Sequence, residues 1–265
     1  MTFPGNFAGD CLLIRKKSPL IHNITNYVAM EPCANALLAI GASPLMSSEP
    51  AEMRDLAAIS SALAVNTGCL EERQLEAMEL AAAAFSESGK PWVLDPAGAG
   101  ASRFRTEAAM RLAGDFRPDV IRANASEIIA LAGGRVSSRG VDSADKAEDA
   151  LEDAVKLAAS LHCIVSLSGR TDYITDGVTV IALANGSPMM GTVTAMGCTA
   201  SAITAAFLAV ETDRLAAAAS AMALMGLAGE AAEKVSNGPG SFAISFRDCL
   251  YNMNPAEEAG KIRIL

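Results

Sequence analysis

Short apolar runs alternate along the chain with longer amphipathic or alanine-rich segments. Five short runs are almost entirely apolar and end at a polar residue or glycine; they cover residues 20–22, 63–66, 92–95, 120–122 and 164–167. Strands that are buried on both faces of a parallel sheet have this pattern. The intervening and following segments have helical character; they cover residues 33–40, 51–61, 71–88, 106–114, 126–132, 143–161, 199–210, 215–235 and 242–252.

Two further short strands, residues 172–175 and 178–183, flank Asp176-Gly177. This dipeptide between apolar runs is a strong signal for a tight hairpin. Alternating strands and helices therefore predict an α/β fold with three layers, α/β/α, in which a mainly parallel central sheet carries an antiparallel hairpin at one edge. Because no linker, low-complexity block or internal repeat interrupts the pattern, we expect a single domain over residues 1–265.

The composition fits a globular protein and narrows the range of partners. Hydrophobic residues make up 51% of the 265 residues and charged residues 19%, and the formal net charge is −9. An acidic chain without a Lys/Arg cluster argues against nucleic acid or an anionic membrane as the main partner. The most apolar windows, residues 200–210 and 215–228, are shorter than the roughly 20 residues that cross a bilayer, so we expect no membrane span.

The cysteines and the N-terminal segment predict a cytoplasmic location. The six cysteines are scattered without a C-x-x-C pair, which is typical of a reduced protein rather than of a disulfide framework or a zinc site. The first short apolar stretch is preceded by an acid and followed by bases, the reverse of a secretory signal.

In a parallel sheet the ligand lies beyond the carboxyl ends of the strands, so the polar residues at those ends are candidates for chemistry. Asp95 ends one predicted strand and is followed by Pro96 and a loop of small residues. An ordinary strand-to-helix turn, with Asp95 as a local cap, is the alternative. The spacing Gly98-x-Gly100 lacks the third glycine of a dinucleotide-binding loop, so that motif is weak.

The next predicted strand leads through Arg122 into Asn124 and Glu127. The spacing of Asn124 and Glu127 fits a helix N-cap with its reciprocal glutamate, which is a purely structural interpretation. The functional alternative has Arg122 binding phosphate and Glu127 facing Mg²⁺ or its waters. Ser168 also ends a predicted strand, but a hydroxyl at such a turn means little by itself.

A loop of small and hydroxyl residues, 191–198, enters a helix built from small residues. The free N–H groups and the positive dipole end of that helix would bind a phosphate or a developing oxyanion. Cys198 lies in the first turn, where a thiol is easier to deprotonate; the alternative is a small buried core residue. Of the two histidines, His22 could line a pocket, whereas His162 precedes a core strand.

Taken together, these segments resemble the hydroxyethylthiazole kinase family of the ribokinase-like group. The resemblance is carried by blocks that occur in order along nearly the whole chain, at residues 19–26, 34–46, 94–101, 121–127, 140–142, 197–198 and 238–242. It implies a ribokinase-like fold. It also implies transfer of the ATP γ-phosphate to the primary alcohol of 4-methyl-5-(2-hydroxyethyl)thiazole, a step of thiamin salvage.

The resemblance also implies residue roles and partners. The implied contacts are with the ATP phosphates (Arg122 and Ser168), with Mg²⁺ (Asp95 and Glu127), with the thiazole (Asn26, Met46, Gly68 and Ala195) and with the reacting hydroxyl (Cys198). The small-molecule substrate and ATP are the implied ligands. The implied assembly is a homotrimer with its active sites at subunit boundaries.

Two small-for-small differences separate this chain from the family pattern. The usual Thr-Gly-x-Gly-Cys is here Thr-Ala-x-Gly-Cys, so Ala195 stands where the family has a glycine, which tolerates a positive φ and a close backbone approach. The usual Arg-Gly-Asn is Arg-Ala-Asn, with Ala123 in the middle, and Ser168 stands where threonine is more frequent.

Three other functions remain open at this stage. One is a kinase of the same fold for another small alcohol, such as a pyrimidine or a sugar. Another is an ATP-dependent lyase of the same fold that dehydrates a damaged nicotinamide cofactor, which would be expected to carry an aspartate near Cys198 in the sequence. The last is a hydrolase with Cys198 as nucleophile, for which the sequence offers no evident histidine partner.

Overall fold

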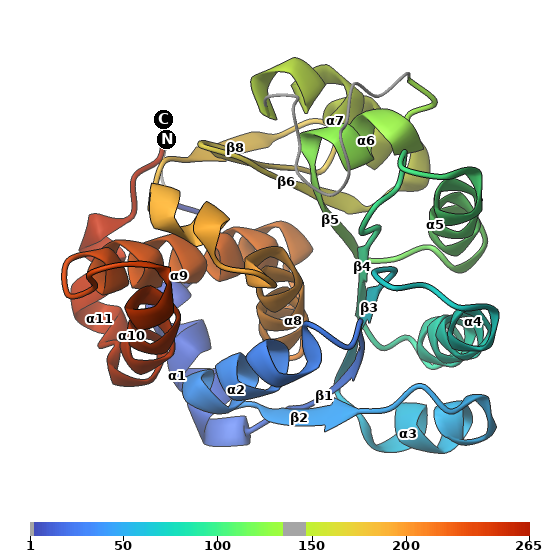
Figure 1. Cartoon of the computed structure of the whole chain (residues 1–265), viewed down its shortest axis with the longest axis horizontal. Coiled ribbons are helices and arrows are strands. Elements are labelled where there is room, and N and C mark those ends of the chain that lie inside the picture. The colour runs from blue at the N-terminus through green and yellow to red at the C-terminus, as the bar shows by residue number, and fades with distance from the viewer. Residues whose placement is uncertain (1–2, 135–146) are drawn as a thin grey trace.

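A single eight-stranded sheet forms the centre of the computed structural model, which describes residues 3–134 and 147–265 (Figure 1). The strand order is β2-β1-β3-β4-β5-β6-β7-β8. The strand bounds are β1 Leu20–Ile24, β2 Ser43–Met46, β3 Ala62–Asn66, β4 Trp92–Asp95, β5 Val120–Asn124, β6 Ile164–Ser168, β7 Asp172–Thr175 and β8 Val180–Leu183. The first six strands of this order pair in parallel, and β7 and β8 pair antiparallel at the edge.

Helices cover both faces of the sheet (Figure 1). One layer contains α3 Met53–Ile59, α4 Glu72–Glu87, α5 Arg103–Phe116, α6 Ala125–Leu131 and α7 Ala147–Leu161. The opposite layer contains α1 Phe7–Lys17, α2 Met30–Ile40, α8 Met196–Leu208, α9 Arg214–Glu233 and α10 Pro239–Asn252, with the short α11 Pro255–Glu258 beside α1. The predicted three-layer fold, with a mainly parallel sheet and an antiparallel edge hairpin, is confirmed.

Helix α9, which is rich in alanine, lies at the centre of one layer. Helix α9 packs against α8 and α10, and 15 of its residues are buried. Small side chains allow such close approach of helix backbones. Helix α9 is longer than the apolar window in the sequence suggested, and is long and apolar enough to cross a membrane, but 83% of its most apolar stretch is buried inside the fold.

Strand β2 and helix α1 are among the elements that the sequence pattern did not predict. Strand β2 contains Pro44, and a proline argues against a strand because it cannot donate to the ladder. Here the strand lies at the edge of the sheet and pairs with β1 alone, so one side of its backbone needs no partner. Helix α1 buries Phe7, Cys11 and Ile14, which have helical spacing, but Gly9 interrupts the pattern.

Several boundaries also differ from the prediction. Helix α8 begins at Met196 rather than at residue 199, so it takes in the glycine and cysteine of the loop motif. The block at residues 140–142 and the start of the predicted helix 143–161 lie outside the described residues.

The parallel order of the strands brings their polar carboxyl ends together. Because β1, β3, β4, β5 and β6 are parallel and adjacent, their carboxyl ends lie side by side at one end of the sheet. Asn66, Asp95, Asn124 and Ser168 are the last residues of four of these strands. Helix α8 also begins at this end of the sheet, where its first turn contacts Arg122 of β5.

Candidate active site

Two buried carboxylates lie together at the strand ends. Asp95 is 2% exposed, and its Oδ2 accepts a hydrogen bond of 2.7 Å from Ser201 Oγ on α8. Glu127 is 5% exposed and lies in the first turn of α6. Burial and the neighbouring charge of Asp95 raise the pKa of Glu127 to about 7, and burial raises the pKa of Asp95. A cation placed between them would relieve this repulsion.

Glu127 is also a helix cap, as its spacing from Asn124 predicted. Its Oε2 accepts from the Asn124 backbone N–H at 2.9 Å, and the Asn124 side chain accepts from the Glu127 N–H at 3.0 Å. The other oxygen, Oε1, accepts from the Gly98 N–H at 3.0 Å and so joins the loop after β4 to α6. The capping interpretation is therefore confirmed, and capping leaves the carboxylate beside Asp95.

A buried cation lies against the start of α8. Arg122, on β5, is 9% exposed, and its Nη2 donates to Ser168 Oγ at 2.7 Å. A Cβ added to Gly197 would lie only 2.5 Å from Arg122 Nη1, so the guanidinium packs directly on the backbone of the first turn of α8. The Nε atom of Arg122 has no hydrogen-bond partner among the described residues. A cation and the N–H groups of a helix start thus lie side by side, an arrangement that binds phosphate.

The Cys198 thiol lies beside Asp95 and two asparagine side chains. Asn66 Nδ2 donates to its Sγ at 3.3 Å, and Asn26 Nδ2 lies at 3.6 Å. Burial and the charge of Asp95 raise the pKa of Cys198 to about 12, outweighing the Asn26 contact and the charge of Arg122. The expectation that the helix start would ease deprotonation of this thiol is wrong, because desolvation and a neighbouring anion dominate.

The asparagine pair depends on a glycine. Asn66 Oδ1 accepts from Asn26 Nδ2 at 2.9 Å and from the Gly68 N–H at 3.0 Å. A Cβ at Gly68 would lie 2.6 Å from Asn26 Nδ2, so a larger residue would displace the pair. Asn66 was not singled out in the sequence, although it ends a predicted strand as Asp95 does.

Met46 and Ala195 complete the set of residues that the resemblance singled out. Met46 is the last residue of β2, half-buried, in register with Asn23 of β1. Ala195 is the N-cap of α8, with φ 65° and ψ 8°, which is the left-handed conformation. The substitution of Ala195 for the family glycine therefore falls where a positive φ occurs.

A cavity of about 1090 Å³ opens beside Arg122, Ser168 and Gly197. Asp172, the first residue of β7, also lines it, and its Oδ1 accepts from the Gly169 N–H at 3.0 Å. Burial raises the pKa of Asp172 to about 7. Sequence reasoning missed this residue, since it lies inside a predicted hairpin strand with no motif around it.

A model of the hydroxyethylthiazole kinase family matches residues 12–256. This chain belongs to the hydroxyethylthiazole kinase family. It is 48% identical over 250 residues to the hydroxyethylthiazole kinase of Brachyspira hyodysenteriae, covering 94% of both chains. The solved structure of the hydroxyethylthiazole kinase protein from Pyrococcus horikoshii is 34% identical, with a TM-score of 0.88 and 98% of both chains covered.

The fold of this family member is ribokinase-like. A ribokinase-like superfamily protein from Enterococcus faecalis, only 14% identical, superposes with a TM-score of 0.62 over 94% of this chain and 90% of the other. Sequence identity this low supports the fold alone.

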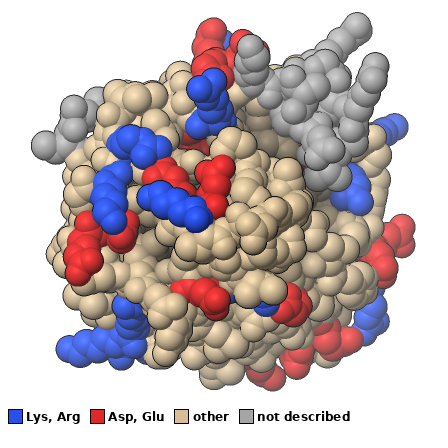
Figure 2. Space-filling model, turned by 60° about the vertical axis from the view of Figure 1, so that its left-hand side comes forward, with Lys and Arg blue, Asp and Glu red and all other residues tan. Residues whose placement is uncertain are grey.

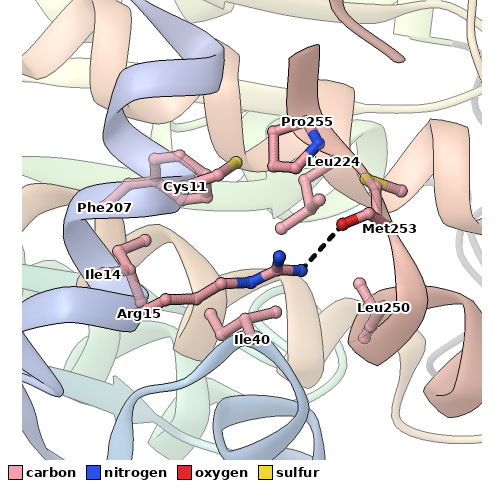
Figure 3. Close-up of a pocket in the computed structure, with 9 residues that line it drawn as sticks. All are labelled: Cys11, Ile14, Arg15, Ile40, Phe207, Leu224, Leu250, Met253 and Pro255. Carbon is pink, nitrogen blue, oxygen red and sulfur yellow. Dashed lines mark hydrogen bonds between the residues drawn. The ribbon is translucent and has the colours of Figure 1, made fainter. Parts of the chain in front are cut away.

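A second cavity, enclosed by helices of the layer that contains α8 and α9, has a different character. It is lined by apolar side chains from α1, α2, α8, α9 and α10, and the guanidinium of Arg15 donates to the Met253 carbonyl at 2.9 Å (Figure 3). Its volume of about 10 Å³ leaves room for one water at most. Arg15 therefore acts as a packing and hydrogen-bonding link between α1 and the chain after α10, and the large cavity is the candidate ligand site.

Proposed function

We propose that this chain transfers the γ-phosphoryl group of ATP to the primary alcohol of 4-methyl-5-(2-hydroxyethyl)thiazole, which yields the thiazole monophosphate for thiamin synthesis. Family membership supports the substrate. The observation that carries the chemistry is the contact of the Arg122 guanidinium with Gly197 at the start of α8, next to the carboxylate pair. Phosphoryl transfer needs mainly positioning and charge stabilisation, and these groups supply both.

On the donor side, Arg122, Ser168 and the first turn of α8 bind the ATP phosphates. Asp95 and Glu127 fit Mg²⁺, because this ion is held by one or two carboxylates together with substrate phosphates and keeps several waters. No group of three or more His, Cys, Asp or Glu side chains that could hold a metal ion occurs in the part of the chain that the structure describes. When bound, the ion would neutralise charge on the phosphates.

On the acceptor side, Asn26, Met46, Gly68 and Ala195 bind the thiazole. Cys198 lies beside the hydroxyl as an orienting group. With a pKa near 12 its thiol is protonated at neutral pH, so it is a poor base. A loose transition state demands little deprotonation of the alcohol, so orientation is sufficient.

The same pKa argues against a hydrolase with Cys198 as nucleophile. His22 is buried, with its Nε2 3.1 Å from the Ser47 carbonyl and its ring beside Phe85. Kinases for other small alcohols remain a matter for a substrate panel.

We propose a homotrimer with active sites at subunit boundaries. Tyr27 and Val28 follow Asn26 directly and are 65% and 57% exposed, which leaves apolar surface next to the thiazole side of the site. Apolar surface of this kind is a common mark of a protein interface. Light scattering on the active protein tests this, since a fully active monomer would contradict a shared pocket.

We also propose a cytoplasmic enzyme without a nucleic-acid or membrane partner. All six cysteines are free, which suits a reducing compartment. On the face in Figure 2, Lys and Arg are interspersed with Asp and Glu and separated by broad uncharged areas, rather than gathered in a basic patch.

The decisive assay combines purified protein, ATP, Mg²⁺ and hydroxyethylthiazole, with mass spectrometry for the monophosphate. Asp95→Asn should keep the hydrogen bond with Ser201 and lower turnover at least a hundredfold, without lowering the melting temperature, because it removes a buried charge. Asp119→Asn is the matched control. Asp119 is a buried carboxylate that directly precedes β5, at the amino ends of the strands, and it binds the Trp92 N–H and Arg214.

The control should leave turnover per folded molecule unchanged. Wild-type turnover in Asp95→Asn would remove the carboxylate pair from the mechanism. Absence of thiazole phosphate, together with ready phosphorylation of another alcohol, would show that the substrate is wrong.

A further inference from the structure

The Asn66 side chain contacts two groups of the candidate active site, Asp95 and Cys198. Asn66 is the last residue of β3, is 2% exposed, and lies opposite Asp95 in the register of β3 and β4. Ala64 and Val93, two residues earlier on each strand, pack in the hydrophobic cluster that contains α8. Because side chains alternate along a strand, Asn66 and Asp95 point to the same face of the sheet, where α8 supplies Cys198.

Backbone N–H groups settle how the two buried amides of the site are turned. Asn26 Oδ1 accepts from the Ala29 N–H at 3.0 Å, so the Asn26 atom that faces Asn66, at 2.9 Å, is the donor Nδ2. Asn66 must present its oxygen there, and the same Oδ1 accepts from the Gly68 N–H at 3.0 Å. A turned Asn66 amide would place its NH₂ group against two donors. The NH₂ group therefore faces the other way.

The two hydrogens of the Asn66 NH₂ group go to Cys198 and Asp95. One is donated to Cys198 Sγ at 3.3 Å. The other reaches Asp95, where burial raises the pKa of the carboxyl and hydrogen bonds from Ser201 and Asn66 oppose the increase. The Asp95 carboxylate is thus held from two elements, by Ser201 of α8 at 2.7 Å and by Asn66 of β3.

This arrangement leaves the hydrogen of the Cys198 thiol unused by the amides. Sγ accepts from Asn66 Nδ2 at 3.3 Å and from Asn26 Nδ2 at 3.6 Å. Since both amides donate to the sulfur, the S–H cannot point at either of them. Burial raises the pKa of the thiol to about 12, so Cys198 keeps its hydrogen at neutral pH and can donate it to a substrate oxygen.

We infer that Asn66 is a positioning residue for the phosphoryl transfer: its amide holds the Asp95 carboxylate and the Cys198 thiol in one arrangement and keeps the thiol hydrogen free for the acceptor hydroxyl. The inference rests on the proposed function. Misplacing a reacting group by about 1 Å can cost roughly a hundredfold in rate. Substitutions of Asn66 should therefore lower kcat, with a much smaller effect on the KM for ATP, whose phosphates are assigned to Arg122 and Ser168.

Two substitutions distinguish positioning from packing. Asn66→Asp keeps the volume but replaces the NH₂ group with an oxygen, which repels Asp95 and attracts the thiol hydrogen. Asn66→Ala removes both donors and part of the volume without adding a charge. We expect kcat per folded molecule to fall about a hundredfold for Asn66→Asp and about tenfold for Asn66→Ala, with the folded fraction measured by circular dichroism. A packing role predicts the reverse order, because alanine leaves the larger cavity, and that order would overturn the inference.

Gln74→Glu is the matched control for the exchange of an amide for a carboxylate. Gln74 is a buried residue of α4, in the other helix layer, and its Nε2 donates to the Thr25 carbonyl at 3.2 Å. This variant should keep kcat per folded molecule close to that of the wild type. A loss as large as that of Asn66→Asp would overturn the inference, because any buried carboxylate would then have the same effect.

A double-mutant cycle shows whether Asn66 acts through Cys198. In a Cys198→Ala background, the loss of kcat caused by Asn66→Ala should be smaller by a factor of about three or more, because one of the groups that Asn66 positions is absent. Equal losses in the two backgrounds would contradict the inference.

Crystal structures separate this inference from the proposed function. In Asn66→Asp the Asp95 carboxylate should turn away from the new carboxylate, while the backbones of β3 and β4 stay unchanged. If it turns and the wild-type protein gives no thiazole phosphate, the arrangement inferred for Asn66 stands and the proposed reaction fails. If the wild-type protein phosphorylates the thiazole, and Asp95 and Cys198 keep their positions in Asn66→Asp, the reaction stands and the inference fails.

Discussion

Replacing Ala195 with glycine should reveal the backbone strain at the start of α8. Ala195 has φ 65° and ψ 8°, a conformation that costs a residue with a Cβ roughly 1–2 kcal/mol and costs glycine almost nothing. Glycine in turn has greater freedom in the unfolded chain, which costs about 0.4–1 kcal/mol, and it loses a half-buried methyl group worth about 0.4 kcal/mol. The expected net gain in unfolding free energy is about 0.5 kcal/mol.

Ala209 provides a matched control at the other end of the same helix. It is half-buried against the same hydrophobic cluster, but its φ of −70° and ψ of −15° are ordinary for alanine. Ala209→Gly has the same unfolded-state and packing losses without relief of strain, so it should lose about 1 kcal/mol. The difference between the two variants, roughly 1–2 kcal/mol, is the cost of the left-handed conformation itself.

Urea unfolding followed by circular dichroism measures both variants. The midpoint should rise slightly for Ala195→Gly and fall for Ala209→Gly, with the slope unchanged. In thermal unfolding, a difference of 1 kcal/mol corresponds to about 2–4 °C for a chain of this size. Equal losses of stability in the two variants would refute the assignment of strain to Ala195.

Three further predictions concern the site. Iodoacetamide at pH 8 should label the exposed Cys69 and leave Cys198 unmodified in the folded protein, because burial and Asp95 raise the pKa of Cys198 to about 12. Peptide mass spectrometry checks this, and fast labelling of Cys198 would contradict it. Gly197→Ala should raise the KM for ATP at least tenfold with a smaller effect on the KM for thiazole, since its methyl group would displace the Arg122 guanidinium. Equal changes in both constants would argue against phosphate binding by Arg122 and the start of α8. Between about pH 4.5 and 7 the folded protein retains a proton on Glu127 that the unfolded chain has lost, so the stability of the metal-free protein should fall as pH rises through this window. Mg²⁺ should restore the stability above pH 7. Melting curves at pH 5.5 and 7.5, with and without Mg²⁺, would show no such pattern if the carboxylate pair does not bind the ion.

Local pattern was sufficient for the interior strands and for the helix cap at Asn124. Buried parallel strands are short apolar runs, and β3, β4, β5 and β6 appear as such in the sequence. Asn124 and Glu127 are three residues apart, and their capping box forms within one helical turn. Asp95 could be identified for the same reason, since a polar residue that ends a buried strand is visible in the sequence.

The edge strand β2 could not be predicted from the local sequence pattern. Pro44 hides β2, because a proline is compatible with a strand only where one side of the strand is unpaired, and only the assembled sheet shows which strand is at the edge. The family resemblance supplied Met46 at the end of this strand, where the residue pattern alone did not.

The chemical state of the site was decided by contacts between distant parts of the chain. The position of Cys198 at a helix start is local and favours a thiolate, yet Asp95 lies 103 residues earlier in the sequence and, together with burial, holds the thiol protonated. The guanidinium of Arg122 likewise fits against α8 only because residue 197, on another element, is glycine. The sequence by itself determined the strands, the cap and the residue types at the strand ends, since these follow from neighbours along the chain. Only the tertiary structure decided burial and charge proximity, and hence which of those residues carry a proton.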